Sequence, residues 1–144
     1  HMQLTRLVQN TAKVHFNQHA MQSSRFGKRL VYGGHIISIA HALSFDGLEN
    51  AFSMAGWNSG AHCNPCFAGD TIYASTEVLD KAEIAEYDNT LGALRLRLVA
   101  YKNADPQQEE IPLRGEDKKY DSRVVLDLDY WALMPLRPVQ PVTA

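Results

Sequence analysis

The sequence predicts an α+β fold in which an antiparallel sheet is wrapped around one long central helix. The first observation is a proline-free run over residues 36–55 in which apolar residues recur at helical spacing. The second is that the segments after this run alternate apolar and polar residues, as strands with one buried face do. Because no helical pattern separates these segments, the strands are expected to pair antiparallel.

The composition suits one globular domain, which we expect to span residues 1–144. The chain has 144 residues, of which 45% are hydrophobic, so it can bury a substantial core. Fourteen basic residues stand against sixteen acidic ones, and this net charge of −2 argues against a nucleic-acid partner and against a membrane surface. No apolar stretch reaches membrane-spanning length and no signal peptide opens the chain, so a cytoplasmic protein is expected.

The segment before the long helix is mixed and polar. Residues 4–14 predict the end of a helix that runs into a loop, and residues 16–29 predict a short helix followed by a loop. Cations gather just before the long helix, either as part of a solvated loop, which we favour, or as contacts to a phosphate group: Arg25, Lys28 and Arg29.

The long helix begins after two glycines, Gly33 and Gly34. About 20 residues at ~1.5 Å rise per residue give ~30 Å, enough to cross a small domain. The first N–H groups of a helix lack partners, so they could approach a ligand and stabilise negative charge on a carbonyl oxygen. Alternatively, the glycines only make the turn into a core helix, and the spacing alone does not decide between these interpretations. His35 and His41 are expected to be core histidines.

Four strand-like segments follow the helix, over residues 57–67, 71–79, 94–101 and 124–134. An Asn-Pro pair interrupts the first, and the alternation in the third predicts one buried face and one partly exposed face. Residues 88–89 predict a turn, and the charged residues 102–123 predict an exposed, mobile loop. The tail, residues 135–144, contains three prolines and is expected to be extended.

The cysteines and histidines do not predict a metal site or any other cofactor. Cys63 and Cys66 lack the second pair that structural zinc needs, and a redox pair normally opens a helix. We therefore expect two reduced thiols on a strand and its edge. His15 and His19 have the spacing of zinc-binding helices, but Phe16 stands where the metalloprotease glutamate would be.

A sheet curled around one long apolar helix is the hot-dog arrangement, and the motifs resemble those of the MaoC-like dehydratases. They are N-T-x-x-x-H at residues 10–15, the glycine turn into the helix, and N-P-x-F-x-G-D-T at residues 64–71. More narrowly, the chain is similar to the C-terminal half of the mesaconyl-CoA hydratase family, also called β-methylmalyl-CoA dehydratase. That similarity rests on residues 7–17, 29–35 and 125–131 and covers residues 4–138.

The resemblance implies a hydration site. In the MaoC-like family, an aspartate and a histidine five residues later activate water for addition to an α,β-unsaturated acyl-CoA, and here these positions hold Asn10 and His15. An amide cannot accept a proton, so Asn10 could only position the water, and His15 would be the single acid/base group. Gly33 falls where the family offers a backbone N–H to the thioester oxygen. Substrate contacts are expected from Tyr32, Gly34, Arg25, Lys28 and Arg29.

The start of the chain departs from the resemblance, because relatives carry a strand and most of a helix before the catalytic pair. We therefore expect a partner to cover apolar surface, either in a homodimer or higher homo-oligomer or as a second hot-dog half.

Three functions stay open. We favour a hydratase or dehydratase acting on a short acyl-CoA, branched or unbranched, such as mesaconyl-CoA. The alternatives are a non-catalytic acyl-CoA-binding or dimerisation half and, more weakly, a hot-dog thioesterase. A thioesterase would want a carboxylate facing the long helix, whereas Asp46 and Glu49 lie toward its far end.

Overall fold

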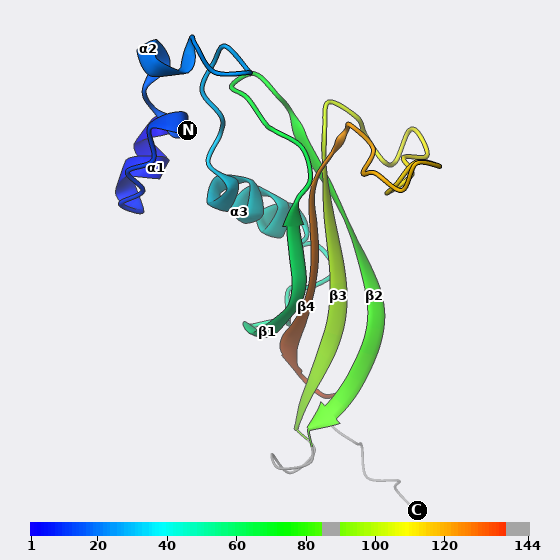
Figure 1. Ribbon diagram of the computed structural model, residues 1–144. Helices are drawn as coiled ribbons and strands as arrows, with labels where there is room; N and C mark the ends of the chain where they lie inside the picture. The colour runs from blue at the N-terminus through cyan, green and yellow to red at the C-terminus, as the bar shows by residue number, and fades with distance from the viewer. Residues whose placement is uncertain (85–89, 138–144) are drawn as a thin grey trace, which may run out of the picture.

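The computed structural model describes residues 1–84 and 90–137 (Figure 1). The helical elements are α1 (Met2–Leu7), the 3-10 turn η1 (Lys13–His15), α2 (Gln18–Met21) and α3 (Gly33–Leu43). The strands are β1 (Ser53–His62), β2 (Ile72–Ile84), β3 (Leu91–Lys102) and β4 (Val124–Pro135). Over the described ranges no helix lies between the strands, so the predicted α+β class is confirmed. No helix in these ranges is long and apolar enough to cross a membrane.

The strands form one antiparallel sheet in the order β1-β4-β3-β2. The central pair, β3 and β4, places Leu96 opposite Tyr130 and Leu98 opposite Leu128. Figure 1 shows α3 lying against one face of this sheet, with long, curved strands passing it. This is the predicted hot-dog arrangement of a sheet on a central helix.

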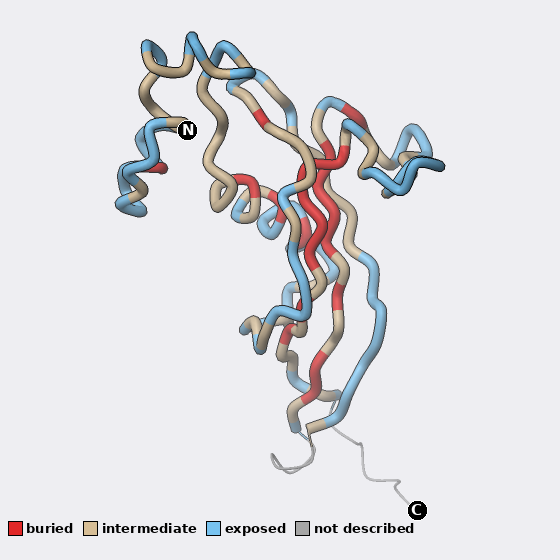
Figure 2. The backbone as a smooth tube through the Cα atoms, viewed as in Figure 1, coloured by how far each residue is buried: buried red, intermediate tan, exposed pale blue. Residues whose placement is uncertain are grey.

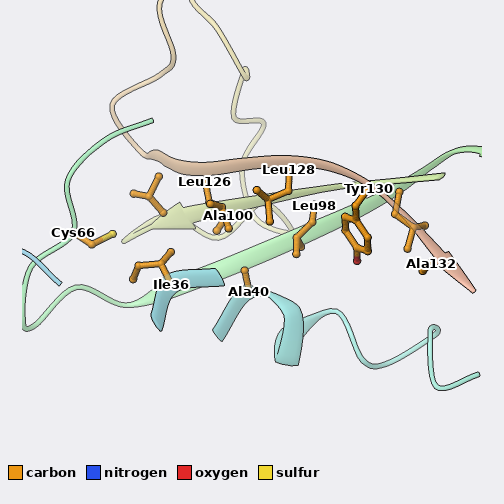
Figure 3. Packing of buried hydrophobic residues seen from close by; sticks show 11 residues of the cluster. Ile36, Ala40, Cys66, Leu98, Ala100, Leu126, Leu128, Tyr130 and Ala132 are labelled. Atoms are coloured by element: carbon orange, nitrogen blue, oxygen red, sulfur yellow. The ribbon is translucent and has the colours of Figure 1, made fainter. Parts of the chain in front are cut away.

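The core lies between α3 and the sheet. Ile36 and Ala40 of α3 face the apolar side chains of β3 and β4, as Figure 3 shows. These strand residues occupy alternate positions, as predicted: Leu96, Leu98, Ala100, Leu126, Leu128, Tyr130 and Ala132. Burying a leucine side chain contributes ~1.5–3 kcal/mol, so this layer holds the helix against the sheet. In Figure 2 the buried residues gather in β3 and β4, whereas residues 77–83 of β2 are exposed.

The central helix is shorter than predicted, because α3 has 11 residues and ends at Leu43. The hydroxyl of Ser44 donates to the carbonyl of His41 at 2.8 Å, and Gly47 adopts a left-handed φ of 90° that ends any helical path. Residues 44–52 form a loop instead. Its apolar residues pack on the same core as α3, which is why the helical spacing continued past the end of the helix: Leu48 and Ala51.

The helix is also covered on fewer sides than its composition predicted. Ile36 and Ala40 are buried, but Ser38 and His41 are exposed. The prediction of a core histidine is therefore wrong for His41, whose ring lies at the edge of the core, 6.5 Å from the ring of Tyr130. His35 is half-buried.

The first strand occupies residues 53–62 rather than 57–67, and both cysteines lie in the loop after it. This loop leaves the sheet because the side-chain amide of Asn64 donates to the carbonyls of Asp121 and Val124, at 2.8 and 2.7 Å. The predicted position of Cys63 and Cys66 on a strand and its edge is therefore wrong, although both are free thiols. The third and fourth strands lie close to their predictions, and the second runs further, to residue 84. The predicted turn at 88–89 and the tail beyond 137 lie outside the described residues.

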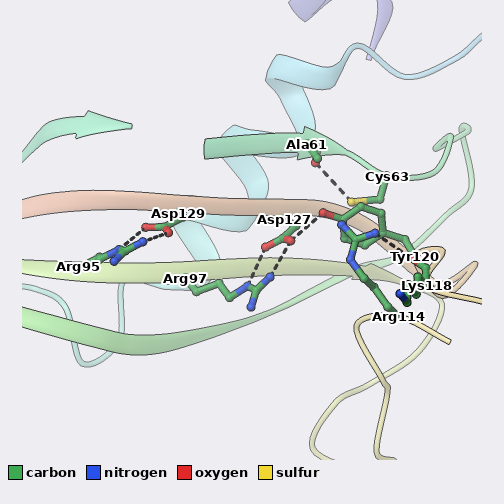
Figure 4. Close-up of polar contacts among 9 residues, drawn as sticks. All are labelled: Ala61, Cys63, Arg95, Arg97, Arg114, Lys118, Tyr120, Asp127 and Asp129. Carbon is green, nitrogen blue, oxygen red and sulfur yellow. Dashed lines mark hydrogen bonds and ion pairs between the residues drawn. The ribbon is translucent and has the colours of Figure 1, made fainter. Parts of the chain in front are cut away.

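The opposite face of the sheet carries two ion pairs (Figure 4). Arg95 donates two hydrogen bonds to the carboxylate of Asp129, at 2.9 and 2.6 Å, and Arg97 donates two to Asp127, both at 2.9 Å. Each pair joins β3 to β4 across the register of the sheet. Charge-assisted, bidentate bonds of this kind are strong and directional, so they fix the two central strands against each other.

The loop predicted at residues 102–123 is only partly exposed. Its charged residues are mostly exposed, but three of its other residues pack on the face of the sheet opposite α3: Ile111, Leu113 and Tyr120. The hydroxyl of Tyr120 also donates to Asp127 at 2.9 Å. This packing could not be predicted from the sequence, because the apolar residues of the loop are dispersed among charged ones. The mobility of this loop stays a prediction from the sequence.

Candidate active site

A pocket of about 530 Å³ opens at the N-terminal end of α3. Three segments enclose it: the stretch from η1 to the start of α3, the first turns of α3, and the loop after β1. Its lining is largely apolar and includes a few polar groups. The lining residues are His15, Arg25, Phe26, Leu30, Val31, Tyr32, Gly33, Gly34, Ile36, Ile37, His62, Cys63, Asn64, Pro65, Cys66 and Val125. A concave, mostly apolar site with few polar groups is typical of small-molecule binding.

A second pocket, of about 500 Å³, lies at the other end of α3, between the helix, the loop 44–52 and the sheet. It is lined by His41 and Tyr130 among mainly apolar residues, and none of the predicted site residues reaches it. Of these two pockets, only the first is lined by predicted site residues.

His15 is held at this pocket by one ring nitrogen. Its Nδ1 lies 3.1 Å from the carbonyl oxygen of Leu30, and its ring meets the ring of Tyr32 edge-on at 5.5 Å. Because a carbonyl oxygen only accepts, Nδ1 must carry the hydrogen in this bond. In the neutral ring Nε2 then has the free lone pair, as a general base requires.

Gly33 and Gly34 form the first turn of α3, after Tyr32 as the N-cap residue. The carbonyl of Tyr32 accepts from the N–H groups of His35 and Ile36, at 3.0 and 3.4 Å. Within the described parts of the chain, the N–H groups of the two glycines have no hydrogen-bond partner. These donors, at the positive end of the helix dipole, are suited to an oxygen that gains negative charge.

Both glycines lie close to the ring of a neighbouring side chain. A Cβ atom on Gly33 would lie 2.5 Å from Nε2 of His62, and one on Gly34 would lie 2.6 Å from the ring of Tyr32. These distances are far inside van der Waals contact. The bare backbone at these two positions lets neighbouring rings approach it, and a side chain at either position would have to displace the ring.

The sequence analysis missed His62, the last residue of β1. Its ring is covered by α3 on one side and open on the other, and this partial burial lowers its pKa. His62 lines the pocket together with His15. The available signal was its place two residues before the N-P-x-F-x-G-D-T motif, at the end of a strand. That position points to the pocket only once the strand is known to end beside the start of α3.

The predicted site residues separate into two groups. His15, Arg25, Tyr32, Gly33 and Gly34 all line the pocket. The others are absent from its lining: Asn10, Lys28 and Arg29.

The three residues outside the lining make local contacts. The side-chain oxygen of Asn10 accepts from the N–H of Ala12 at 2.9 Å, so it closes a tight turn before η1. The ammonium of Lys28 lies 4.1 Å from the centre of the Phe67 ring, and Arg29 donates to the carbonyl of Phe16 at 3.3 Å.

The pocket is basic, and its thiols are inert. Its lining contains two histidines and an arginine but no aspartate or glutamate. Burial raises the pKa of Cys63 and of Cys66 to about 11. Neither thiol is therefore a nucleophile near neutral pH. In the described residues no group of histidine, cysteine or acidic side chains is arranged to hold a metal ion.

A sheet curved over one helix, with a histidine and a diglycine helix start at one pocket, defines a MaoC-like hot-dog protein. Structural comparison agrees: a MaoC domain protein from Chloroflexus aurantiacus superimposes with a TM-score of 0.88 at 56% identity, covering 96% of this chain and 38% of that one. The MaoC-like dehydratase from Rhodospirillum rubrum shares the fold, with a TM-score of 0.68 at 18% identity over 96% of this chain and 84% of that one.

The chain belongs to the mesaconyl-CoA hydratase family, whose sequence profile matches residues 2–113. It is 57% identical, over 95% of its length, to the beta-methylmalyl-CoA dehydratase of Chloroflexus aurantiacus. It is 58% identical, over 94% of its length, to the mesaconyl-CoA hydratase of Cereibacter sphaeroides. The chain spans only 38% and 37% of the lengths of these two relatives.

Proposed function

We propose that this chain forms a hydratase or dehydratase site that adds water to, or removes it from, the α,β double bond of a short acyl-CoA such as mesaconyl-CoA. One observation carries the proposal: His15, with Nδ1 fixed by Leu30, shares a pocket with the unpaired N–H groups of Gly33 and Gly34. The names of the two relatives support the reaction and the acyl group.

The pocket supplies the two parts that hydration needs. The thioester oxygen accepts hydrogen bonds from the N–H groups of Gly33 and Gly34, which polarises the double bond. Nε2 of His15 takes a proton from water as the water oxygen bonds to the β carbon. The π electrons move toward the thioester oxygen, forming an enolate next to the helix N-terminus. The imidazolium then returns the proton to the α carbon, and dehydration is the reverse sequence.

The remaining site residues have supporting roles in this proposal. Tyr32 packs on the ring of His15 and fixes its orientation. Arg25 lies in the pocket lining, with its guanidinium 4.3 Å from the centre of the Phe26 ring, and contacts a phosphate of coenzyme A. Lys28 and Arg29 extend this cationic surface. Asn10 lies outside the pocket lining and its oxygen accepts from Ala12, so its proposed role is to hold water through the amide nitrogen.

The chain is proposed to work with a partner, as a homo-oligomer or beside a second hot-dog half. The supporting observations are the larger size of the relatives and the apolar surface of this chain. Phe52, just before the edge strand β1, is 64% exposed, and Trp57, within that strand, is 51% exposed. A cytoplasmic location stays a prediction from the sequence.

A non-catalytic acyl-CoA-binding half is the second candidate, because Asn10 is an amide and is absent from the pocket lining. The thioesterase hypothesis has less support. Asp46 and Glu49 lie in the loop after α3, and no carboxylate lines the pocket at the start of the helix.

The test is a hydration assay over a panel of enoyl-CoA thioesters, followed by the absorbance of the conjugated thioester. We expect turnover by the wild type and a loss of ~10²–10⁴-fold in His15→Ala, the usual cost of removing a general acid/base. His19→Ala is the matched control, because His19 is exposed and outside the pocket lining. Equal turnover by His15→Ala would contradict the proposal. If the wild type binds acyl-CoA but hydrates no member of the panel, the non-catalytic half is the better hypothesis.

A further inference from the structure

The pocket at the start of α3 is lined by hydrogen-bond donors and by no acidic side chain. Its polar lining includes His15, Arg25 and His62, and the helix N-terminus adds partial positive charge. Partial burial lowers the pKa of His62, so near neutral pH this imidazole is a neutral N–H donor. The proposed function assigns Arg25 to a phosphate of coenzyme A, the helix N-terminus to the thioester oxygen and His15 to water, which leaves His62 without an assigned role. An imidazole donor in a lining without acidic side chains suits an acyl group that is itself an anion.

The acyl groups named for the two relatives have this property. Mesaconic and methylmalic acids are dicarboxylic acids, so a thioester at one end leaves a free carboxylate at the other. Only two carbons separate that carboxylate from the thioester carbonyl carbon. A residue that binds it must therefore lie close to the donors that bind the thioester oxygen, Gly33 and Gly34.

His62 meets this requirement. Its Nε2 would lie 2.5 Å from a Cβ on Gly33, so the imidazole packs on the backbone of the glycine that begins the helix. His62 is exposed and lines this pocket. We infer that His62 binds the free carboxylate of a dicarboxylic acyl-CoA and thereby selects it over a neutral acyl-CoA. This inference rests on the proposed function for the thioester end of the substrate.

The two other basic side chains of the pocket are less suited to this role. Nδ1 of His15 is engaged by the carbonyl of Leu30, and its remaining nitrogen is assigned to the water. Arg25 has its guanidinium 4.3 Å from the centre of the Phe26 ring and is assigned to a phosphate of coenzyme A in the proposed function. His62 alone combines contact with the first turn of α3 and an open face.

The test compares two pairs of four-carbon thioesters that differ only in a carboxylate or a methyl group. Calorimetric binding of succinyl-CoA and butyryl-CoA requires no turnover, whereas hydration of fumaryl-CoA and crotonyl-CoA reports the reaction. In His62→Leu we expect affinity for succinyl-CoA to fall about ten- to a hundredfold, the range for losing a hydrogen bond to a charged group. Affinity for butyryl-CoA should change less than about threefold. His62→Gln keeps one donor and should lie between wild type and His62→Leu, while His19→Leu should match the wild type.

The two pairs separate failure of this inference from failure of the proposed function. If the wild type hydrates neither mesaconyl-CoA, fumaryl-CoA nor crotonyl-CoA, the hydratase proposal fails, and the binding data still test the role of His62. The inference is overturned if the wild type binds succinyl-CoA no better than butyryl-CoA. It is equally overturned if His62→Leu weakens both ligands alike, because His62 would then act on the shared part of the ligand or on the fold.

Discussion

The imidazole of His62 occupies the space that a side chain on Gly33 would need. An added Cβ atom would lie 2.5 Å from Nε2 and 2.6 Å from Cε1 of that ring. The contact joins the end of β1 to the start of α3, two elements that pack beside the same pocket. It also explains why glycine begins this helix, although alanine has the better helix propensity.

We expect Gly33→Ala to displace the His62 ring and weaken acyl-CoA binding about tenfold or more, with little change in far-UV circular dichroism. The fold should survive, because the ring is open on one side and can move. Gly56→Ala is the control, since a Cβ on Gly56 meets nothing within 4 Å. Removing the ring as well, in Gly33→Ala/His62→Ala, should restore butyryl-CoA binding. If the double variant binds as poorly as Gly33→Ala, the clash is not the cause.

The faces of the central strands could be predicted from the sequence, whereas the extent of α3 and the position of His62 could not. Leu96 and Leu98 alternate with Arg95 and Arg97, and a period of two assigns each set to one face whatever the tertiary structure. The helix end was placed too late because Leu48 packs on the same core from a loop. The contact of His62 with the start of α3 depends on where β1 ends, which no local pattern contains.

Acid should destabilise the fold through the ion pairs opposite α3. Hydrogen bonds from Arg95 and Asn58 lower the pKa of Asp129 to about 2. Burial tends to raise the pKa of Asp127, but bonds from Arg97 and Tyr120 outweigh it, so that pKa is lowered too.

Because both carboxyl pKa values are lower in the folded state, their stabilisation is complete above the unfolded value, near 4, and is lost as the pH falls toward 2. Urea midpoints measured between pH 7 and pH 2.5 should show this loss. Asp127→Asn should lower the free energy of unfolding by about 1–3 kcal/mol at pH 7. Its urea midpoint should also fall less steeply than that of the wild type as the pH is lowered. If the urea midpoint of Asp127→Asn/Asp129→Asn falls as steeply with decreasing pH as that of the wild type, this assignment is contradicted.

The two cysteines should resist alkylation in the native protein. A pKa raised from 9.0 to about 11 leaves about a hundredfold less thiolate at pH 8, and thiolate is the reactive form. Iodoacetamide labelling followed by mass spectrometry should therefore be much slower for the native chain than for the chain in urea. Native labelling as fast as in urea would show that these thiols are neither buried nor suppressed.

Self-association should involve the edge of the sheet formed by β1. Trp57 on this strand is 51% exposed, and only the β4 side of the strand is paired in the described structure. Sedimentation at micromolar concentration should show a dimer or higher species, and Trp57→Glu should shift it toward monomer. Val78→Glu, on the opposite edge strand β2, is the matched comparison, because Val78 is 56% exposed. A wild type that stays monomeric at these concentrations would count against the proposed partner.

The amide of Asn10 should limit the rate without being essential. Its oxygen accepts from the N–H of Ala12 at 2.9 Å, a bond that a carboxylate could keep, so Asn10→Asp should preserve the turn before η1. The carboxylate would also give water a second proton acceptor, so we expect enoyl-CoA hydration equal to or faster than wild type. Asn10→Ala should hydrate more slowly, because it loses both the turn and the amide that holds the water. Stopped-flow measurement of hydration beside thermal melting separates these effects. If Asn10→Ala hydrates as fast as the wild type, Asn10 holds no catalytic water, and His15 must work with a group from elsewhere.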